Sequence, residues 1–480
     1  MTDKLAHPNQ ERVEKDSLGE MRLDNKHYFG IQTQRAVNNF SISGTVLDDY
    51  PGYIAAIARI KKAAALANSD IKRLSREQSR LICQAADEIT AGKMTGQFPV
   101  DLFQGGGGTS TNMNVNEVIA NRASELATGC KGYDPIHPNT HVNMGQSTND
   151  VIPAAMKICI HEELARVENS LSCAVEAFGR KEDEFRDVVK VGRTCLQDAL
   201  PMTMGQMFGG YRAAVERQAD NLRIAKGLLL TLPLPGTAIG TCLGAFPGFA
   251  EALYRHLGAE TGVPFRQDDN LFDALQNADV WMQVSTTLKA CASIFGKCSA
   301  DLRIMGSGPR AGFNEITLPP VQPGSSIMPG KVNPVIPEMM MQVAFRVFGN
   351  DLSVSLAADR GELDLNVWES LILTCILESI SLLSQGIVLF VDKCLCGITA
   401  NADKCAADAH NSLALSTVLA TLFDYPLAST IAKTAFEKNK SVKETAIEAG
   451  VLTPARAEIL LDPRNLTDIE IFERVVNENG

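Results

Sequence analysis

The chain has 480 residues, a formal net charge of −11 and an apolar fraction of 45%. This length exceeds one typical hydrophobic core and predicts two or three domains. The acidic balance, with no lysine or arginine run and no interleaved aromatic stripe, argues against nucleic acid as a partner. A membrane span is not expected, because the longest uncharged run, Gly227 to Ala250, contains prolines and several glycines.

The N-terminal segment and the cysteines indicate a cytoplasmic location. Met1 to Asp16 is polar and charged, unlike a secretory signal with an apolar middle. Twelve cysteines are scattered along the chain, which is typical of reduced thiols. The close pair Cys394 and Cys396 has no second ligand pair beside it, and a proline separates His137 from His141. We therefore predict no metal site and no cofactor, and activation by Mg²⁺ leaves no signature in the sequence.

Helical periodicity begins after a polar, turn-rich stretch that ends near Pro51. A glycine-rich break at Gly105 to Gly108 and a loop around His137 to Gln146 each lead into a predicted helix start. The helices expected before residue 151 are Ala55–Ala67, Ser75–Thr90 and Asn114–Ala127.

Long periodic segments in the middle of the chain predict a helix bundle. They are Val151–Phe178, Gly205–Leu230, Asn277–Ile304, Val335–Leu356 and Trp368–Val391. The last segment is apolar nearly all round, so we expect it to be buried on every side, as in a bundle at the centre of an oligomer.

Shorter elements follow Gly397 and predict a small C-terminal domain. The helices expected there are Asn401–Leu422, Ala428–Lys438 and Ser441–Ala449. Few strand signals occur, so the pattern predicts an all-α protein with domains at 1–150, 151–400 and 401–480.

The segment Gly324 to Asn333 reads Gly-Ser-Ser-Ile-Met-Pro-Gly-Lys-Val-Asn and is the most informative stretch of the chain. Its glycines predict a mobile loop, and Pro334 is suited to open the helix that follows. Lys331 supplies a cation, Asn333 supplies a donor, and Ser325 or Ser326 supplies an oxygen base. This chemistry suits a doubly charged acid.

Three further motifs precede predicted helices. Gly105 to Asn112 combines glycines with hydroxyls and predicts a carboxylate site, with a plain linker as the alternative. Gln146 to Asp150 has the composition of a helix cap. In the segment Gly192 to Pro201, Arg193 and Asp198 either form an ion pair with each other or bind a ligand.

The loop resembles the pattern of the aspartase/fumarase superfamily, whose members eliminate ammonia, water or a larger amine to leave fumarate. The resemblance covers nearly the whole chain, through the stretches Arg12–Gly44, Gln104–Ala123, His137–Pro153, Gly192–Gln206 and Gly312–Asp351. It implies a three-domain all-α fold whose central long-helix bundle forms the core of a homotetramer.

The resemblance also implies the roles of individual residues. Ser325 would be the catalytic base, with its alkoxide favoured by nearby amides, a helix start and Lys331. Thr109 and Asn149 would hold the leaving amine. The predicted substrate-binding residues are Thr109, Ser147, Thr148, Asn149, Thr194, Cys195, Ser326, Lys331 and Asn333.

Four positions depart from the family pattern. Cys195 stands where fumarases have histidine and aspartases have glutamine, so acid catalysis by a histidine is not expected there. Glu338 resembles the glutamate that pairs with that histidine in the family. It either loses this hydrogen-bond partner or lies in its helix as a solvated acid. Gly145 replaces serine, and Cys242 and Gly244 stand where Gly-Leu-Asn is usual. These changes either admit a larger amino substituent or are neutral repacking.

Details of the motifs favour the aspartase branch, and we predict reversible deamination of a small dicarboxylate amino acid, L-aspartate, to fumarate and ammonia. The alternatives are fumarate hydration and elimination from a substituted or enlarged aspartate. A catalytically silent protein of the same fold is a further alternative, against which the presence of Ser325, Lys331 and Asn333 argues.

Overall fold

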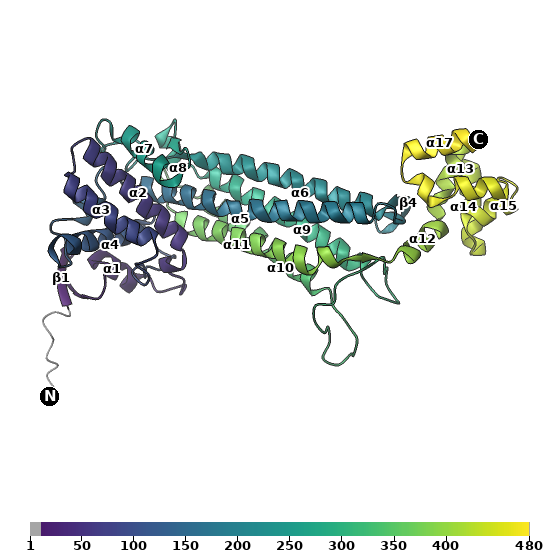
Figure 1. The fold of residues 1–480 in the computed structure, drawn as a ribbon, viewed down its shortest axis with the longest axis horizontal. Coiled ribbons are helices and arrows are strands. Elements are labelled where there is room, and N and C mark those ends of the chain that lie inside the picture. Colours follow the sequence, from purple (N-terminus) through teal and green to yellow (C-terminus); the bar gives the residue numbers. More distant parts are fainter. Residues whose placement is uncertain (1–10, 480) are drawn as a thin grey trace. The chain divides into compact units, whose positions relative to one another are not determined.

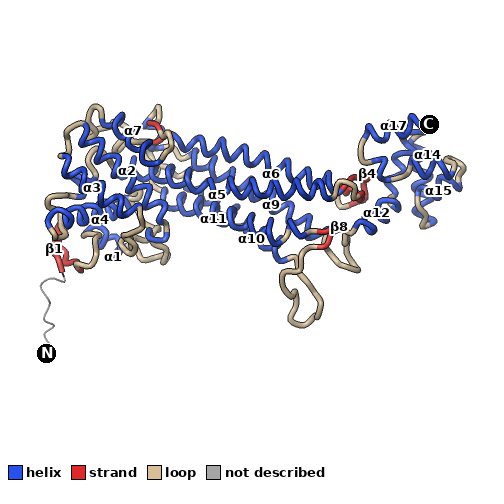
Figure 2. Tube along the Cα trace, viewed as in Figure 1, coloured by secondary structure: helices blue, strands red, loops and turns tan. Residues whose placement is uncertain are grey.

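The computed structural model describes residues 11–479, and the chain divides into two compact units. The first contains the chain up to Val167, Asn221–Lys289 and Arg346–Ser381, and the second contains Glu168–Asp220, Ala290–Phe345 and the chain from Leu382 onward. Helices dominate both units and the strands are short (Figure 1, Figure 2). The all-α prediction is confirmed. The division into three domains stays a prediction, and the predicted polar segment Met1–Asp16 lies mostly outside the described residues.

Five long helices correspond to the predicted bundle segments, and each contributes residues to both units. They are α5 (Thr148–Glu184), α6 (Met204–Gly227), α9 (Asp279–Met305), α10 (Val335–Asp359) and α11 (Glu369–Lys393). Apolar residues at helical spacing explain why these five segments form helices that pack together, because each apolar stripe is removed from water when another helix packs on it.

The first unit also contains shorter helices, of which α2 packs against both α3 and α7. The helices are α1 (Ile31–Asn39), α2 (Pro51–Asp70), α3 (Arg76–Thr90), α4 (Thr109–Thr128), α7 (Phe249–Thr261) and α8 (Leu271–Gln276). The strands are β1 (Glu11–Asp16) and β2 (Gly19–Asp24), which form an antiparallel hairpin, and the parallel pair β5 (Thr231–Leu232) and β6 (Arg266–Gln267). Ser75, the first residue of the predicted helix Ser75–Thr90, is the N-cap of α3 and forms a capping box with Gln78.

The second unit contains the C-terminal helices and two small antiparallel sheets. The strands are β3 (Val189–Thr194), β4 (Gln197–Thr203), β7 (Ile316–Thr317) and β8 (Thr399–Ala400). The helices are α12 (Ala402–Asn411), α13 (Ser416–Leu422), α14 (Tyr425–Lys438), α15 (Val442–Glu448), α16 (Pro454–Leu460) and α17 (Ile469–Asn479). Leu419, Ile431 and Val442 belong to one apolar core that α13 to α17 share.

Some sequence predictions differ from the structure. The polar stretch before Pro51 contains a hairpin and α1, because backbone pairing and buried carboxylates stabilise elements with little apolar periodicity. The single predicted helix Asn401–Leu422 is interrupted at Ser412, whose backbone is extended and whose side chain accepts from Ala414 N. Serine competes with the helix in this way because its hydroxyl caps the next turn.

Helix α11 is not buried on every side within one chain. Val388 and Leu389 are 49% and 46% exposed, whereas Ile380 and Leu383 are fully buried. Among the described residues, the stretch Glu369–Gly397 is the one helix long and apolar enough to cross a membrane, and 56% of its most apolar window is buried. A core helix of a soluble protein passes the same test.

Candidate functional site

The loop that contains Ser325 closes on itself in the second unit. Gly324 N donates to Lys331 O at 2.7 Å, and Asn333 Nδ2 donates to Gly324 O at 2.8 Å. The hydroxyl oxygen of Ser325 accepts from Ile327 N at 3.2 Å and from Met328 N at 2.9 Å. Two amide donors on one oxygen favour its negatively charged form, which is what an alkoxide base requires.

The remaining polar groups of this loop are exposed. Lys331 and Ser326 lie on its outer part, and in the described chain the Lys331 ammonium forms no ion pair. Asn333 precedes α10, so the loop leads directly into a helix start. Glu338 in the first turn of α10 lies 3.5 Å from Arg303 Nη2 and therefore has a cationic neighbour in place of the missing imidazole.

The hairpin of β3 and β4 carries Thr194 and Cys195 at its exposed tip. Cys195 and Leu196 form the two-residue turn with φ values of +53° and +59°. Below the tip, Arg193 forms an ion pair with Glu315, which is fully buried and also lies 3.2 Å from Lys190 Nζ. Arg193 thus pairs with Glu315, and the predicted alternative of a pair with Asp198 is wrong. No hydrogen bond joins Thr194 to the Ser325 loop among the residues from 11 to 479.

The other predicted substrate contacts lie at two helix starts in the first unit. Thr109 is the first residue of α4, and Thr148 is the first residue of α5. The two helices approach closely at Gly108, where an added Cβ would lie 3.0 Å from Ile152 and where φ is +79°. Only glycine satisfies both conditions without strain. The positive ends of two helix dipoles are therefore close together, and this arrangement suits an anionic ligand.

A buried polar chain lies behind Thr148. Asn112 Nδ2 donates to Thr148 Oγ1 at 3.1 Å and to Asn143 Oδ1 at 3.2 Å. The same Asn143 oxygen accepts from Lys61 Nζ at 2.8 Å. Burial lowers the pKa of Lys61 to about 7, and the charge of Asp150 opposes that shift. None of these supporting residues was predicted from the sequence, although a lysine inside the apolar segment Ala55–Ala67 was a usable signal.

The residues after Thr148 anchor a neighbouring loop. Asn149 Nδ2 donates to Ala238 O at 2.8 Å, which leaves the amide oxygen of Asn149 available as an acceptor. Asp150 is fully buried and accepts from Ser147 N at 2.9 Å and from Thr237 N at 2.8 Å. Burial raises the pKa of Asp150 to about 7, and these backbone donors oppose the shift. The predicted contacts Ser147, Thr148 and Asn149 are thus held against the loop that contains Cys242 and Gly244.

Three positions that depart from the family pattern, Gly145, Cys242 and Gly244, differ in the space and backbone conformation around them. Gly145 has φ +75°, and an added Cβ would lie 3.3 Å from the ring of Phe249, so this ring fills the space that a serine side chain would need. Cys242 has φ +59° although it is not glycine. Apart from its two chain neighbours, no described residue has an atom within 4 Å of a Cβ added at Gly244, so the absence of a side chain leaves open space beside the loop.

A cavity of about 400 Å³ adjoins Thr109 in the first unit. Gln32 and Arg35 of α1 line it, together with His137 and Asn139. The start of α1 is fixed by two buried carboxylates, since Glu117 accepts from the N–H groups of Gly30, Gln32 and Thr33.

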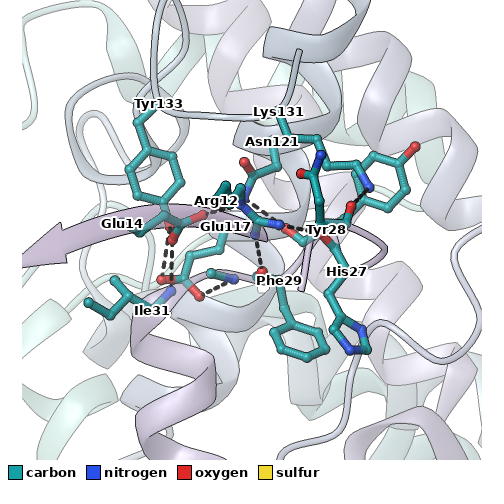
Figure 3. A network of polar contacts seen from close by, with 12 residues as sticks. Arg12, Glu14, His27, Tyr28, Phe29, Ile31, Glu117, Asn121, Lys131 and Tyr133 are labelled. Carbon is teal, nitrogen blue, oxygen red and sulfur yellow. Dashed lines mark hydrogen bonds and ion pairs between the residues drawn. The ribbon is translucent and has the colours of Figure 1, made fainter. Parts of the chain in front are cut away.

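Figure 3 shows the second carboxylate of this network, Glu14, which accepts from Ile31 N at 2.8 Å and from the Tyr133 hydroxyl at 2.5 Å. Arg12 Nε donates to the same carboxylate at 2.7 Å. The backbone N–H groups at the start of α1, which have no partner within the helix, thereby find acceptors, and the α1 side chains that face the cavity are held in place.

Comparison with known proteins identifies the family of the chain. Residues 19–349 match a family model described as lyase, and residues 415–468 match one described as fumarase C C-terminus. An aspartate ammonia-lyase of Helicobacter pylori is 44% identical over 96% of this chain and 99% of its own length.

Solved structures are similar throughout. A fumarate lyase:delta crystallin from Brucella melitensis has a TM-score of 0.92 at 43% identity, covering 95% of this chain and 100% of its own. A class II fumarase from Schistosoma mansoni has a TM-score of 0.92 at 35% identity, covering 95% of this chain and 99% of its own. The predicted resemblance is confirmed, and the chain belongs to the aspartase/fumarase superfamily of lyases.

Proposed function

We propose that this chain reversibly deaminates L-aspartate to fumarate and ammonia. The observation that carries the proposal is the Ser325 hydroxyl oxygen with its two backbone N–H donors. The aspartate ammonia-lyases among its relatives, which match over nearly the full length, support the same reaction.

The proposed chemistry follows from the bonds that change. Ser325, as an alkoxide, removes a proton from the carbon next to one carboxylate, and the electron pair of that C–H bond forms the new C=C bond as the C–N bond breaks. The developing charge on the carboxylate needs donors placed in advance. Thr148, Lys331 and Asn333 are the proposed donors. Because the electron pair stays within the substrate, the reaction needs no redox cofactor.

The leaving group is proposed to lie against Asn149. Its Nδ2 is already engaged with Ala238 O, so its Oδ1 presents an acceptor to the substrate ammonium. Thr109, Ser147, Thr194 and Ser326 complete the proposed set of substrate contacts.

Position 195 favours ammonia over water as the leaving group. An alkylammonium departs as neutral ammonia and needs no further proton, whereas a hydroxyl departs readily only when an acid protonates it. Cys195 supplies no imidazole for that step. Fumarate hydration is therefore the second candidate, and an enlarged aspartate is the third because Gly244 leaves open space.

A homotetramer is the proposed assembly, in the cytoplasm and with three domains per chain. Its support is an exposed apolar stripe along α10, where Phe345, Leu352 and Leu356 are 61%, 60% and 56% exposed. Apolar side chains at this helical spacing are typical of a surface that another helix covers. The partner of that stripe is proposed to be a second copy of the chain.

The experiment that tests the proposed reaction is ultraviolet detection of fumarate after mixing purified protein separately with L-aspartate and with L-malate. Ammonia release is assayed in the same samples. Fumarate and ammonia in equal amounts from aspartate are expected. Fumarate from malate alone would replace this proposal with the hydratase, and no product from either would direct attention to N-substituted aspartates.

A further inference from the structure

Four polar side chains form a continuous hydrogen-bonded line that begins in the interior of the first unit and ends at Thr148. Lys61 Nζ donates to Asn143 Oδ1 at 2.8 Å, and Asn112 Nδ2 donates to that oxygen at 3.2 Å and to Thr148 Oγ1 at 3.1 Å. Lys61 is 0% exposed and Asn112 is 1% exposed. We call this line the Lys61 relay.

The direction of every hydrogen bond in the Lys61 relay is fixed. Lys61 Nζ, whose N–H groups are donors in both the charged and the neutral form, faces the amide oxygen of Asn143. Asn143 Nδ2 donates to the backbone carbonyl of Gln146 at 3.1 Å, which requires the same orientation. Asn116 Nδ2 also donates to Asn143 Oδ1, at 3.1 Å.

The orientation of Asn143 then determines that of Asn112. With an oxygen of Asn143 on one side, Asn112 must present its NH₂ group, because two amide oxygens in contact would repel each other. The same NH₂ group faces Thr148 Oγ1. Thr148 therefore accepts from Asn112, and its own proton is directed elsewhere. Within the described chain, the Thr148 hydroxyl forms no other hydrogen bond.

We infer that Asn112, oriented by Asn143 and Lys61, makes the Thr148 hydroxyl a dedicated hydrogen-bond donor to a substrate carboxylate. This inference rests on the proposed function, in which the substrate is a dicarboxylate. A carboxylate accepts hydrogen bonds and never donates them, so a hydroxyl free to rotate toward an internal acceptor would be a weaker contact. Asn112, Asn143 and Lys61 are thus positioning residues, and Thr148 is the group that touches the substrate.

A double-mutant cycle tests the relay. Asn112→Asp keeps the side-chain shape but presents oxygen acceptors, so the Thr148 proton is expected to turn inward. We expect kcat/KM for L-aspartate to fall by about tenfold or more, the range for losing a hydrogen bond to a charged group. Thr148→Val removes the hydroxyl, and in that background Asn112→Asp is expected to cause little further loss. Lys61→Met is expected to cause a smaller loss than Asn112→Asp, because the Gln146 carbonyl still orients Asn143.

The matched control is Asn114→Asp, which changes another fully buried asparagine of α4 whose Nδ2 donates to Gln97 O at 2.9 Å. This variant perturbs the same helix without touching Thr148, so a loss of kcat/KM comparable with that of Asn112→Asp would overturn the inference. Thermal melting and elution volume establish that each variant folds.

A second readout does not depend on turnover. The affinity for succinate, an unreactive dicarboxylate, is measured by calorimetry for the same four proteins of the cycle. Coupled losses in both readouts support the relay, and independent, multiplying losses contradict it. A wild-type chain that neither forms fumarate from aspartate nor binds succinate contradicts the proposed function itself, which distinguishes the two failures.

Discussion

Arg193 forms an ion pair with Glu315, a carboxylate with no exposed surface, and thereby ties the hairpin that carries Thr194 to the interior of the second unit. The guanidinium also lies 4.6 Å from the ring centroid of Phe313. An exposed two-residue turn would otherwise hold its side chains loosely. The pair therefore gives a predicted substrate contact at the hairpin tip a rigid support.

Arg193→Met should leave the buried Glu315 carboxylate with Lys190 alone. Removing one partner of a buried ion pair costs about 3 kcal/mol or more, because the remaining charge is poorly compensated. We expect a lower unfolding temperature together with a raised KM for the substrate. The control is Arg266→Met, which breaks a pair at 3.3 Å between side chains that are 59% and 92% exposed. Equal unfolding temperatures of the two variants would show that the buried pair contributes no more to stability than the exposed pair does.

Glu369 gives a prediction about pH. Burial raises the pKa of this carboxyl from 4.5 to about 7, although a backbone N–H at the start of α11 opposes the shift. Its Oε2 has no hydrogen-bond partner among the residues that the structure describes. Between pH 4.5 and about 7, the Glu369 carboxyl therefore keeps its proton in the folded state and has lost it in the unfolded state. Stability from this group is present below about pH 4.5 and is lost as pH rises through about 7.

Glu369→Gln should remove that loss. The melting temperatures of wild type and variant are expected to agree near the lower of the two pKa values and to separate as pH rises, with the variant more stable by up to about 3 kcal/mol. The measurement is thermal unfolding from acidic to mildly alkaline pH. Glu362→Gln changes an exposed acid nearby and should follow wild type throughout. A constant offset between wild type and Glu369→Gln at all pH values contradicts the assignment.

The sequence predicted the long helices well because each carries an apolar stripe with a 3.6-residue period, as in α5 and α9. It did not predict the β3–β4 hairpin or α1. The hairpin turns at Cys195 and Leu196, which give no turn signal in the sequence, and the start of α1 is held by Glu117, which lies 87 residues from Gly30. Local patterns carry no information about such distant partners.

The same limit applies to the site. Ser325 and its loop were recognised from adjacent residues, whereas the support of Thr148 comes from Lys61 and Asn112 on separate helices. A buried lysine and a buried asparagine are unremarkable in sequence. Their function follows only from the directions of the hydrogen bonds that the fold creates.

Leu352→Glu tests the proposed assembly. This residue lies in the exposed apolar stripe of α10 and is 60% exposed in one chain, so a charge there costs a monomer little. In an assembly that buries the stripe, an unpaired carboxylate would oppose association. Light scattering during gel filtration is expected to show a smaller species than wild type. Ile42→Glu, at a position 75% exposed outside the stripe, should leave the assembly unchanged, and an unchanged mass for Leu352→Glu would contradict the proposal.

Ser325 is proposed as the base in the deamination of aspartate, and its role is tested by the rate of fumarate formation from L-aspartate by wild type and by Ser325→Ala. The substitution removes the oxygen that accepts from Ile327 N and Met328 N while leaving the rest of the loop in place. We predict rapid fumarate formation by wild type and a loss of about a thousandfold in kcat for the variant, with its oligomeric state intact. A Ser325→Ala variant that forms fumarate at nearly the wild-type rate would contradict the assignment of Ser325 as the base.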